Sequence, residues 1–407
     1  GRKAGPARAA DWAARPTARR SGGAMNAASG FDALGAGSLS ITAEIADDSV
    51  CSVRVVSSRP TRLTRLFIGR PAEEIPVLAE RIYSLCGLSH AIAATRAIAA
   101  ARGEASRAQA DQAQSIALLS ERISEILRSS VTLALHENDA IRLDAGAMGP
   151  LAKAFSLTRD LLALSKSNRL STASDRDALR SIVKKIGAQA RQLGLPGDPG
   201  MLGGRPAPGS WFGLLWTEIV RDEGFAAYVP DALDGDDDAA VLVRLRCDGE
   251  AFAAAPSLPG RAPETGAFAR HWRKTDFYGG GATARLGARM IDLSECLDRL
   301  SRAAAGDEPE QAEAHRLTPA EREGFAAVET SRGRLGHWTR LSPGGKIEDY
   351  AIVAPTEWNF HPAGPFVAAV LGARVSRATA AASIARLAGL FDPCVLYRVE
   401  VTEPAHA

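Results

Sequence analysis

The chain has 407 residues, of which 46% are hydrophobic and 24% are charged, a composition typical of a folded protein with a large buried core. Its net charge of +2 gives no reason to expect a nucleic-acid or membrane-surface partner, and no apolar run approaches the roughly 20 residues that span a bilayer. The five cysteines are an odd number and widely scattered, which argues against a disulfide framework and predicts reduced thiols in a cytoplasmic protein.

The N-terminal segment lacks the pattern of a folded element. Residues 1–24 carry charges but no apolar stretch of the kind that a signal peptide needs, and the first methionine is Met25. We therefore expect residues 1–36 to form a disordered N-terminal arm and residues 37–407 to form the folded domain.

The first half of the domain combines one hairpin with several helices. Residues 38–45 alternate apolar and polar side chains, and residues 50–56 are expected to return antiparallel to them. A long amphipathic helix is predicted over 105–135, because apolar residues recur there at spacings of three and four. Further helices are predicted around 153–165 and 175–193.

The second half begins with a break. Residues 194–209 contain so many glycines and prolines that they predict a loop, and the acidic run at 231–238 is expected to be a solvated loop. Near the C-terminus, residues 334–341 and 347–353 flank Ser-Pro-Gly-Gly-Lys, which predicts a hairpin, and residues 380–390 predict a helix. The pattern as a whole indicates an α+β fold that is mostly helical, with peripheral β-hairpins.

Two of the five cysteines stand out by their surroundings. Cys86 lies in Ser-Leu-Cys-Gly-Leu-Ser-His at the expected start of an alanine-rich helix, where the helix dipole lowers a thiol pKa. Cys394 follows Asp-Pro close to the chain end. The other three are expected to be small buried hydrophobic residues, with Cys51 and Cys247 in strand-like runs and Cys296 on a helical stripe.

The segments around these two cysteines resemble the large subunits of nickel–iron hydrogenases. That family has the motifs Cys-Gly-x-Cys and Asp-Pro-Cys-x-x-Cys, and this sequence reads Cys86-Gly-Leu-Ser89 and Asp392-Pro-Cys394-Val-Leu-Tyr397. Residues 329–338 also resemble the family's Glu-Ala-Pro-Arg-Gly segment, and residues 347–359 resemble the strand that ends in Pro-Thr-Thr-Trp-Asn. The resemblance extends from about residue 37 to 402 and implies a shortened hydrogenase large-subunit-like fold.

The departures from the family pattern bear on function. Each cysteine pair of the family supplies one terminal nickel ligand and one thiolate that bridges nickel to iron. This sequence keeps Cys86 and Cys394 as candidate metal ligands but has Ser89 and Tyr397 at the bridging positions. An un-ionised hydroxyl is a poor substitute for a bridging thiolate. The resemblance therefore implies a non-catalytic accessory protein of the HupK and HoxV type, in which nickel is not expected.

The surroundings of the family's iron are better preserved. That iron carries two cyanides and one carbon monoxide, and Arg332 and Thr356 match the residues that donate hydrogen bonds to the cyanides. The simpler alternative is that Arg332 caps a loop and Thr356 ends a strand. His90 is either a third ligand or a polar surface residue, whereas His337 and His361 have no role that the sequence can assign.

The resemblance implies a scaffold that holds or transfers the Fe(CN)2CO unit during assembly of the nickel–iron active site. Its expected partners are hydrogenase maturation proteins and the hydrogenase large-subunit precursor. Two alternatives remain open: a metal-free large-subunit mimic that organises maturation factors, and an active hydrogenase with an altered metal site.

Overall fold

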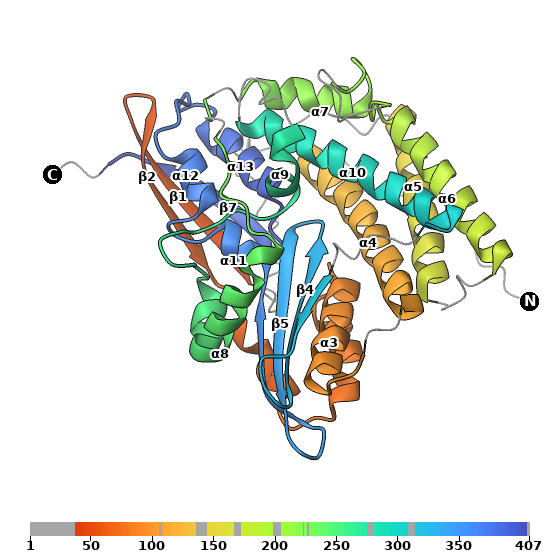
Figure 1. Ribbon diagram of the computed structural model, residues 1–407. Coiled ribbons are helices and arrows are strands. Elements are labelled where there is room, and N and C mark those ends of the chain that lie inside the picture. Colours follow the sequence, from red (N-terminus) through yellow and green to blue (C-terminus); the bar gives the residue numbers. More distant parts are fainter. Residues whose placement is uncertain are drawn as a thin grey trace, which may run out of the picture.

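The computed structural model describes residues 37–105, 108–135, 145–166, 172–197, 205–222, 224–225, 228–274, 281–307 and 314–404. Within them, two small sheets and a group of long helices form a mostly helical α+β fold, as predicted (Figure 1). The N-terminal arm predicted at residues 1–36 lies outside the described residues.

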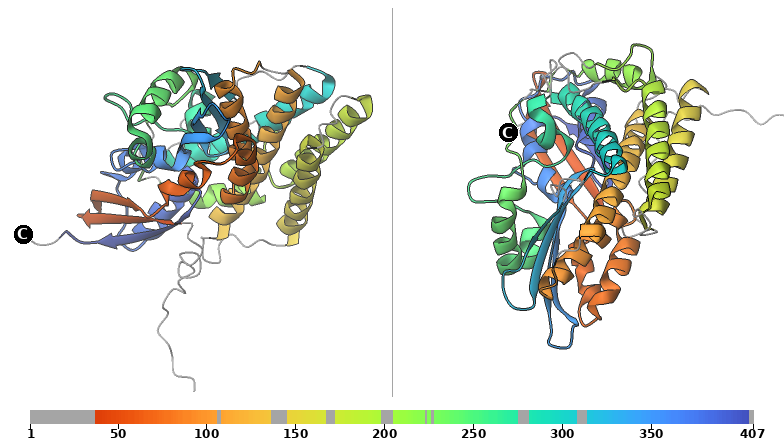
Figure 2. Two further views of the ribbon diagram at one scale, coloured as in Figure 1. Left: turned by 90° about the horizontal axis from the view of Figure 1, so that it is seen from below. Right: turned by 45° about the vertical axis from the view of Figure 1, so that its right-hand side comes forward.

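The first sheet joins the two ends of the folded domain. Strands β1 (Ser38–Ala46) and β2 (Ser49–Ser57) form the predicted antiparallel hairpin, and β7 (Leu396–Thr402) lies parallel to β1 on its other side (Figure 2). Alternate residues of β1 are buried, because one face of the strand packs on the main core. The pairing of β1 with β7 places Cys394, which lies two residues before β7, next to the N-terminal part of the domain.

The second sheet is an antiparallel meander. It consists of β3 (Ala314–Leu317), β4 (Glu323–Thr330), β5 (Gly333–Leu341) and β6 (Ile347–Val353) in that order. Helix α3 (Gly87–Ala101) packs against β4 and β5 on one side, and α8 (Asp238–Ala254) packs against β5 and β6 on the other (Figure 1). Because both faces are covered, β4 is buried throughout and β5 is buried except at Arg340.

One glycine allows α3 to lie close to this sheet. A Cβ atom added at Gly324 would lie 2.0 Å from the carbonyl oxygen of Ala97. Any other residue at this position of β4 would therefore push α3 away from the sheet. Since Cys86 directly precedes α3, this close contact also helps to fix the position of that cysteine.

The long helices form a bundle beside the two sheets. They are α4 (Ala108–Leu135), α5 (Ala145–Lys166), α6 (Ala173–Gln192) and α10 (Gly281–Ala305). The predicted apolar stripe of α4 is buried in the main core at Ile116, Leu119, Ile123, Ile126 and Leu127. The three helices predicted in this half of the chain are thus confirmed, although α5 begins earlier than expected.

Shorter helices complete the fold. They are α2 (Ile75–Ile82), α7 (Trp211–Val220), α9 (Ala267–His271), α11 (Pro355–Asn359), α12 (Pro365–Val370) and α13 (Ala380–Phe391). Short 3-10 helices occur at Thr61–Phe67, Ala72–Glu74, Gly235–Asp237 and Trp272–Lys274. The described parts of the glycine- and proline-rich segment 194–209 contain neither helix nor strand.

Two predictions for the middle of the chain are wrong. The acidic run 231–238 is not simply a solvated loop, because Asp238 begins α8, is 2% exposed and forms an ion pair with Arg334. Cys247 lies within α8 and not in a strand. The sequence around Asp238 is compatible with a loop, but a tertiary contact, the ion pair with Arg334, holds this residue at the start of α8. The sequence around Cys247 is compatible with a strand, but the segment forms a helix.

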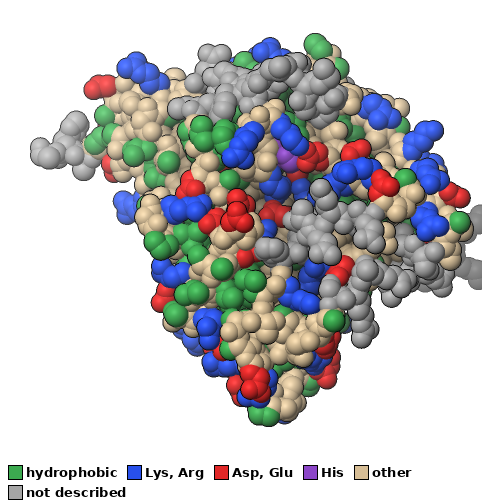
Figure 3. All heavy atoms as spheres, viewed as in Figure 1, with side chains coloured by type: hydrophobic (Ala, Val, Ile, Leu, Met, Phe, Trp, Pro, Cys, Tyr) green, Lys and Arg blue, Asp and Glu red, His purple; other side chains and the backbone are tan. Residues whose placement is uncertain are grey.

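The surface carries charges of both signs. On the face shown in Figure 3, basic and acidic side chains are interspersed. Some of the described charged residues form exposed pairs one helical turn apart, such as Arg244 with Asp248. Among the described residues, we find no helix that combines the length and apolarity needed to cross a membrane.

A buried carboxylate ties the bundle to the short helix α9. Asp292 of α10 is fully buried and accepts hydrogen bonds from Arg122 of α4, from Arg270 Nη2 at 2.9 Å and from His271 Nε2 at 2.9 Å. Burial alone raises the pKa of this carboxyl group, but the charges of Arg122 and Arg270 hold the pKa of Asp292 well below its ordinary value. The folded state therefore favours the ionised form.

Replacing this carboxylate should destabilise the bundle. Because Asp292→Asn leaves two buried guanidinium groups without their shared carboxylate, we expect it to lower the free energy of unfolding at pH 7 by about 3–5 kcal/mol. The lowered pKa stabilises the fold above the unfolded pKa of about 3.9, and this contribution is lost as the pH falls below it. In urea unfolding, the difference from the unmodified chain should therefore shrink between pH 7 and pH 3.

A matched control lies on the same helix. Asp298 is 66% exposed and pairs with Arg302 one turn away, so Asp298→Asn should change the free energy of unfolding by less than about 1 kcal/mol. Equal losses for the two variants would contradict the role assigned to Asp292.

Candidate functional site

Cys86 lies in the short segment between α2 and α3. It is the N-cap residue of α3, with non-helical dihedral angles, and its N–H donates to the carbonyl of Tyr83 at 3.1 Å. A Cβ atom on the following Gly87 would lie 2.4 Å from the carbonyl oxygen of Glu80. The Cys-Gly sequence is thus required sterically, because only glycine lets the two helices meet this closely beside the thiol.

Cys394 is held by the end of α13 and by α11. Asp392 ends α13 in the left-handed conformation (φ 53°), and the chain then runs through Pro393 to the cysteine. The N–H of Cys394 donates to Thr356 Oγ1 at 3.1 Å, and the same hydroxyl lies 3.1 Å from its Sγ. Thr356 is 3% exposed, so a buried hydroxyl fixes both the backbone and the thiol of this cysteine.

The two cysteines, which are far apart in sequence, line one cavity of about 100 Å³. Both are half-buried. The other lining residues come from the segment before α2, from the end of α2 and from the start of β7: Arg59, Pro60, Leu63, Ile82, Tyr83, Ser84, Leu85 and Val395. The structure therefore brings together the two predicted metal ligands.

The structure corrects the direction in which the pKa of Cys86 was expected to shift. Placement at a helix N-terminus led us to expect a lowered thiol pKa. Instead, burial and then the nearby Cys394 raise the pKa of Cys86, although the charges of Arg332 and Arg59 oppose the increase. The metal-free chain thus favours a protonated thiol at Cys86, because desolvation outweighs the helix dipole.

Arg332 lies in the turn between β4 and β5 and is 3% exposed. Its Nη2 donates to Glu125 of α4 at 2.8 Å, and its Nε lies 3.5 Å from the Asp392 carboxylate. Its Nη1 has no hydrogen-bond partner among the described residues. Burial lowers its pKa, but Asp392, Glu125 and both cysteines act in the opposite direction and the net effect raises the pKa of Arg332. This guanidinium is therefore a buried, permanent cation that still has a donor available.

Sequence reasoning missed Arg59, a second arginine at the cavity. Its Nη1 lies 2.6 and 2.7 Å from the two carboxylate oxygens of Glu357, and it lines the cavity beside both cysteines. Burial lowers its pKa, but electrostatic interactions with Cys394 and Glu357 outweigh this and raise the pKa of Arg59 overall. No motif identified this residue, because the tertiary structure alone brings the segment after β2 to the site.

The residues at the two bridging positions are engaged elsewhere. Ser89 Oγ donates to Glu121 of α4, whose carboxylate also accepts the N–H groups of Leu88 at 2.9 Å and Ser89 at 3.0 Å. Burial raises the pKa of Glu121 to about 7 in spite of these hydrogen bonds. Tyr397 packs against the main core, with its hydroxyl close to Gly389 of α13, and it is not among the residues that line the cysteine cavity.

The histidines form a buried hydrogen-bonded row instead of a surface feature. The alternative of a polar surface residue is wrong for His90, which is 1% exposed and stacks on Tyr83 at 3.8 Å. Its Nδ1 lies 3.0 Å from His337 Nε2, and His337 Nδ1 lies 2.8 Å from the Tyr350 hydroxyl. Burial lowers the pKa of His337 to about 3. His361 lies apart from this row and accepts the N–H of Ala363 at 3.1 Å.

The remaining cysteines differ from the prediction in two of three cases. Cys296 is buried in α10 as expected, whereas Cys51 on β2 and Cys247 on α8 are exposed. Among the described residues, no group of three or more His, Cys, Asp and Glu side chains is arranged to hold a metal ion.

Comparisons with known proteins agree with these features. Residues 283–398 match the family model for nickel-dependent hydrogenases. The HupK hydrogenase expression/formation protein of Rhizobium leguminosarum bv. viciae is 38% identical over 92% of this chain and 99% of its own length. The HoxV hydrogenase expression/formation protein of Cupriavidus necator is 31% identical over 86% of this chain and 93% of its own length.

The fold has a counterpart among solved structures. The NiFeSe hydrogenase of Desulfomicrobium baculatum superimposes with a TM-score of 0.62 at 15% identity, covering 86% of this chain and 95% of the other. The resemblance inferred from the four sequence motifs is thereby confirmed at the level of both sequence and fold. The chain belongs to the family of HupK-type hydrogenase expression/formation proteins and has the fold of a nickel–iron hydrogenase large subunit.

Proposed function

We propose that this protein is a non-catalytic assembly factor that holds or hands on the Fe(CN)2CO unit during formation of a nickel–iron hydrogenase. The observation that carries the proposal is that Cys86 and Cys394 line one cavity in which no further cysteine is present. Its partners would be hydrogenase maturation proteins and the large-subunit precursor, in keeping with the names of its relatives.

The iron unit would be the cargo of this protein, and the residues present fit its chemistry. Thiolate sulfur is a soft ligand that binds iron well. The cavity of about 100 Å³ offers two cysteine thiols. Two thiolates and three diatomic ligands would leave iron one position open for exchange. Binding would displace the thiol proton that burial favours at Cys86, so loading would be coupled to proton release.

The cyanide ligands would be recognised by two buried donors near the cysteines, Arg332 and Thr356, which are not themselves among the residues that line the cysteine cavity. Arg332 Nη1 lacks a partner among the described residues and belongs to a permanent cation, and charge-assisted hydrogen bonds are the stronger ones. The Thr356 hydroxyl already lies beside Cys394, where it could donate to a ligand of iron held by that sulfur. Arg59 adds a second positive charge that would offset the thiolates and cyanides.

Nickel would not be retained, because both bridging thiolates are missing. Ser89 Oγ donates a hydrogen bond to Glu121, and the partly buried Tyr397 packs against the main core. A second candidate function is favoured by the described residues, among which no group of three or more His, Cys, Asp and Glu side chains is arranged to hold a metal ion. The protein would then be a metal-free large-subunit mimic that organises maturation factors through its hydrogenase-like surface.

Infrared spectroscopy should distinguish the two candidates. Protein purified from cells that make the hydrogenase should show cyanide and carbonyl bands, and Cys86→Ala and Cys394→Ala should abolish them because each removes an iron–sulfur bond. Cys51→Ala and Cys247→Ala are matched controls, since both thiols are exposed, and they should leave the bands unchanged. Absence of bands from the unmodified protein would favour the metal-free mimic.

Variants of the cyanide-binding donors should weaken retention of the unit. A charge-assisted hydrogen bond contributes about 1.5–3 kcal/mol, so Arg332→Ala should lower retention by about tenfold to a hundredfold. Thr356→Val should lower it less, because a neutral hydroxyl is a weaker donor. The measurement is the intensity and position of the infrared bands. Arg340→Ala, which replaces an exposed side chain on β5, is the control and should leave the bands unchanged. Full-intensity, unshifted bands in Arg332→Ala would make that arginine purely structural.

Metal analysis should show iron without equimolar nickel in the same preparations. In Ser89→Cys, nickel retention should rise above that of the unmodified chain, because a third thiolate would then lie near Cys86. One nickel per chain in the unmodified protein, lost on Cys86→Ala, would contradict the exclusion of nickel.

A further inference from the structure

The first sheet ends in an open edge at β7. Its strand order is β2-β1-β7, so β7 pairs with β1 on one side only, and Figure 2 shows it at the border of the sheet. Among the described residues, none forms a backbone hydrogen bond with the other side of β7. An edge strand of seven residues presents a row of unpaired N–H and C=O groups, with which a further strand can pair.

The core-facing side chains of β7 are covered incompletely. On the neighbouring strand β1, the residues that face the main core are at most 1% exposed: Leu39, Ile41 and Ala43. Their direct neighbours on β7 pack against the same core but are only partly buried: Tyr397, Val399 and Val401. The difference follows from position, because β1 has a strand on each side and β7 has a strand on one side. A further strand beside β7 would cover the apolar surface that remains.

The outer face of β7 carries one cation and one anion two residues apart. Arg398 and Glu400 are exposed, and neither forms an ion pair with a described residue. Arg398 Nε donates to Ser40 Oγ of β1 at 3.0 Å. In an antiparallel pair of two β7 strands centred on Val399, the Arg398 of each copy lies opposite the Glu400 of the other. The strand is therefore complementary in charge to a second copy of itself.

Charge also selects this register over its neighbours. A pair centred on Arg398 places two arginines opposite each other, and a pair centred on Glu400 places two glutamates opposite each other. Like charges directly opposite are destabilising, whereas opposite charges stabilise a pair of strands. The register centred on Val399 gives two pairs of opposite charge on the outer face and brings the two Val399 side chains together on the core side.

The other edge of the sheet lacks these properties. The start of β2 is already bonded to the segment after α12, because Val50 N–H donates to the Ala373 carbonyl at 3.0 Å and Gly372 N–H donates to the Val50 carbonyl at 2.8 Å. Arg54 is the one charged residue of β2. Two copies of β2 therefore offer no cross-strand pair of opposite charge.

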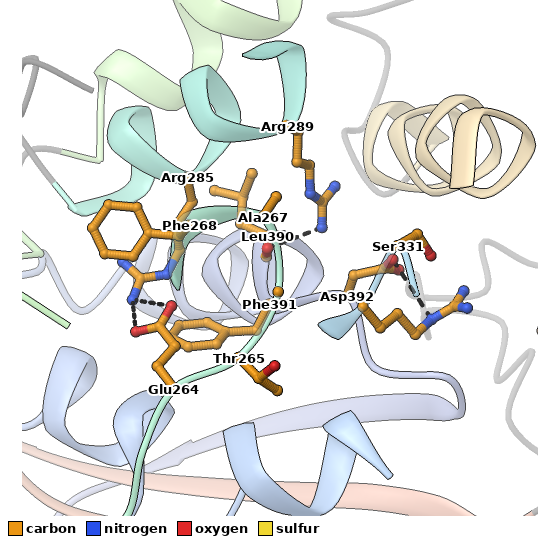
Figure 4. Close-up of a pocket in the computed structure, with 12 residues that line it drawn as sticks. Glu264, Thr265, Ala267, Phe268, Arg285, Arg289, Ser331, Leu390, Phe391 and Asp392 are labelled. Atoms are coloured by element: carbon orange, nitrogen blue, oxygen red, sulfur yellow. Dashed lines mark hydrogen bonds and ion pairs between the residues drawn. The ribbon is translucent and has the colours of Figure 1, made fainter. Parts of the chain in front are cut away.

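The chain holds β7 in position without a partner. Figure 4 shows Arg289 of α10 at the end of α13, where its Nη2 donates to the carbonyls of Gly389 and Leu390 at 2.6 and 2.9 Å. A few residues later the parallel pairing with β1 fixes β7 along its whole length. A strand that is already ordered loses little conformational freedom when it pairs, which favours association.

We propose that β7 is the interface of a homodimer, in which the β7 strands of two copies pair antiparallel about a two-fold axis at Val399. The pairing would join the two three-stranded sheets into one continuous sheet and has the self-complementary form that a two-fold interface requires. No residue of β7 lines the cysteine cavity, so the dimer does not depend on the function proposed for the cysteines.

Analytical ultracentrifugation of the purified full chain at low ionic strength tests this interface. The unmodified chain should show a reversible monomer–dimer equilibrium. Arg398→Glu and Glu400→Arg should each weaken dimerisation by about tenfold to a hundredfold, because each replaces two attractive cross-strand pairs by two repulsive ones. Arg54→Glu is the matched control, since this exposed residue lies on the same face at the other edge, and it should leave the equilibrium unchanged.

Mixing the two weakened variants tests the register. An equimolar mixture of Arg398→Glu and Glu400→Arg should regain association, because one chain then presents two carboxylates and the other presents two guanidinium groups. Both exchanges in a single chain should restore the homodimer, and circular dichroism should be the same for every variant. A monomeric unmodified chain would overturn the proposal and leave the edge of β7 for a different protein. A dimer that neither charge reversal weakens would also overturn it, since the dimer would then use another surface.

Discussion

The side chain of Arg332 joins three parts of the structure that are distant in sequence. From the turn between β4 and β5, its guanidinium contacts Glu125 of α4 and Asp392 at the end of α13. A buried cation of this kind is stable only if its carboxylate partners are held in place. The bundle, the meander and the C-terminal segment must therefore meet at this one point, and the cysteine cavity lies beside it.

The strain at Asp392 is a consequence of this arrangement. A non-glycine residue in the left-handed conformation is uncommon, and here it turns the chain so that its own carboxylate meets Arg332 while Cys394 reaches Thr356. The parallel pairing of β1 with β7 then fixes the chain on the far side of the cysteine. Cys394 is thus held from both directions.

The residues at the two bridging positions, Ser89 and Tyr397, have hydrogen-bonding and packing roles in this fold. Ser89 is paired with Glu121, so the position of one bridge has become part of a polar contact between α3 and α4. Tyr397 instead contributes to the main core. Both positions contribute to the contacts that hold the large-subunit-like fold together.

The sequence by itself determined the elements that depend on local patterns. The β1–β2 hairpin, the stripe of α4 and the β5–β6 hairpin follow from periodicity and turn residues, which act over a few positions. The motifs around Cys86, Cys394, Arg332 and Thr356 identified the family and the candidate ligands. Only the tertiary structure decided the protonation of Cys86, the burial of His90 beside His337, and the presence of Arg59 at the cavity. These depend on desolvation and on contacts between segments far apart in the chain, and no local pattern of residues records either of them.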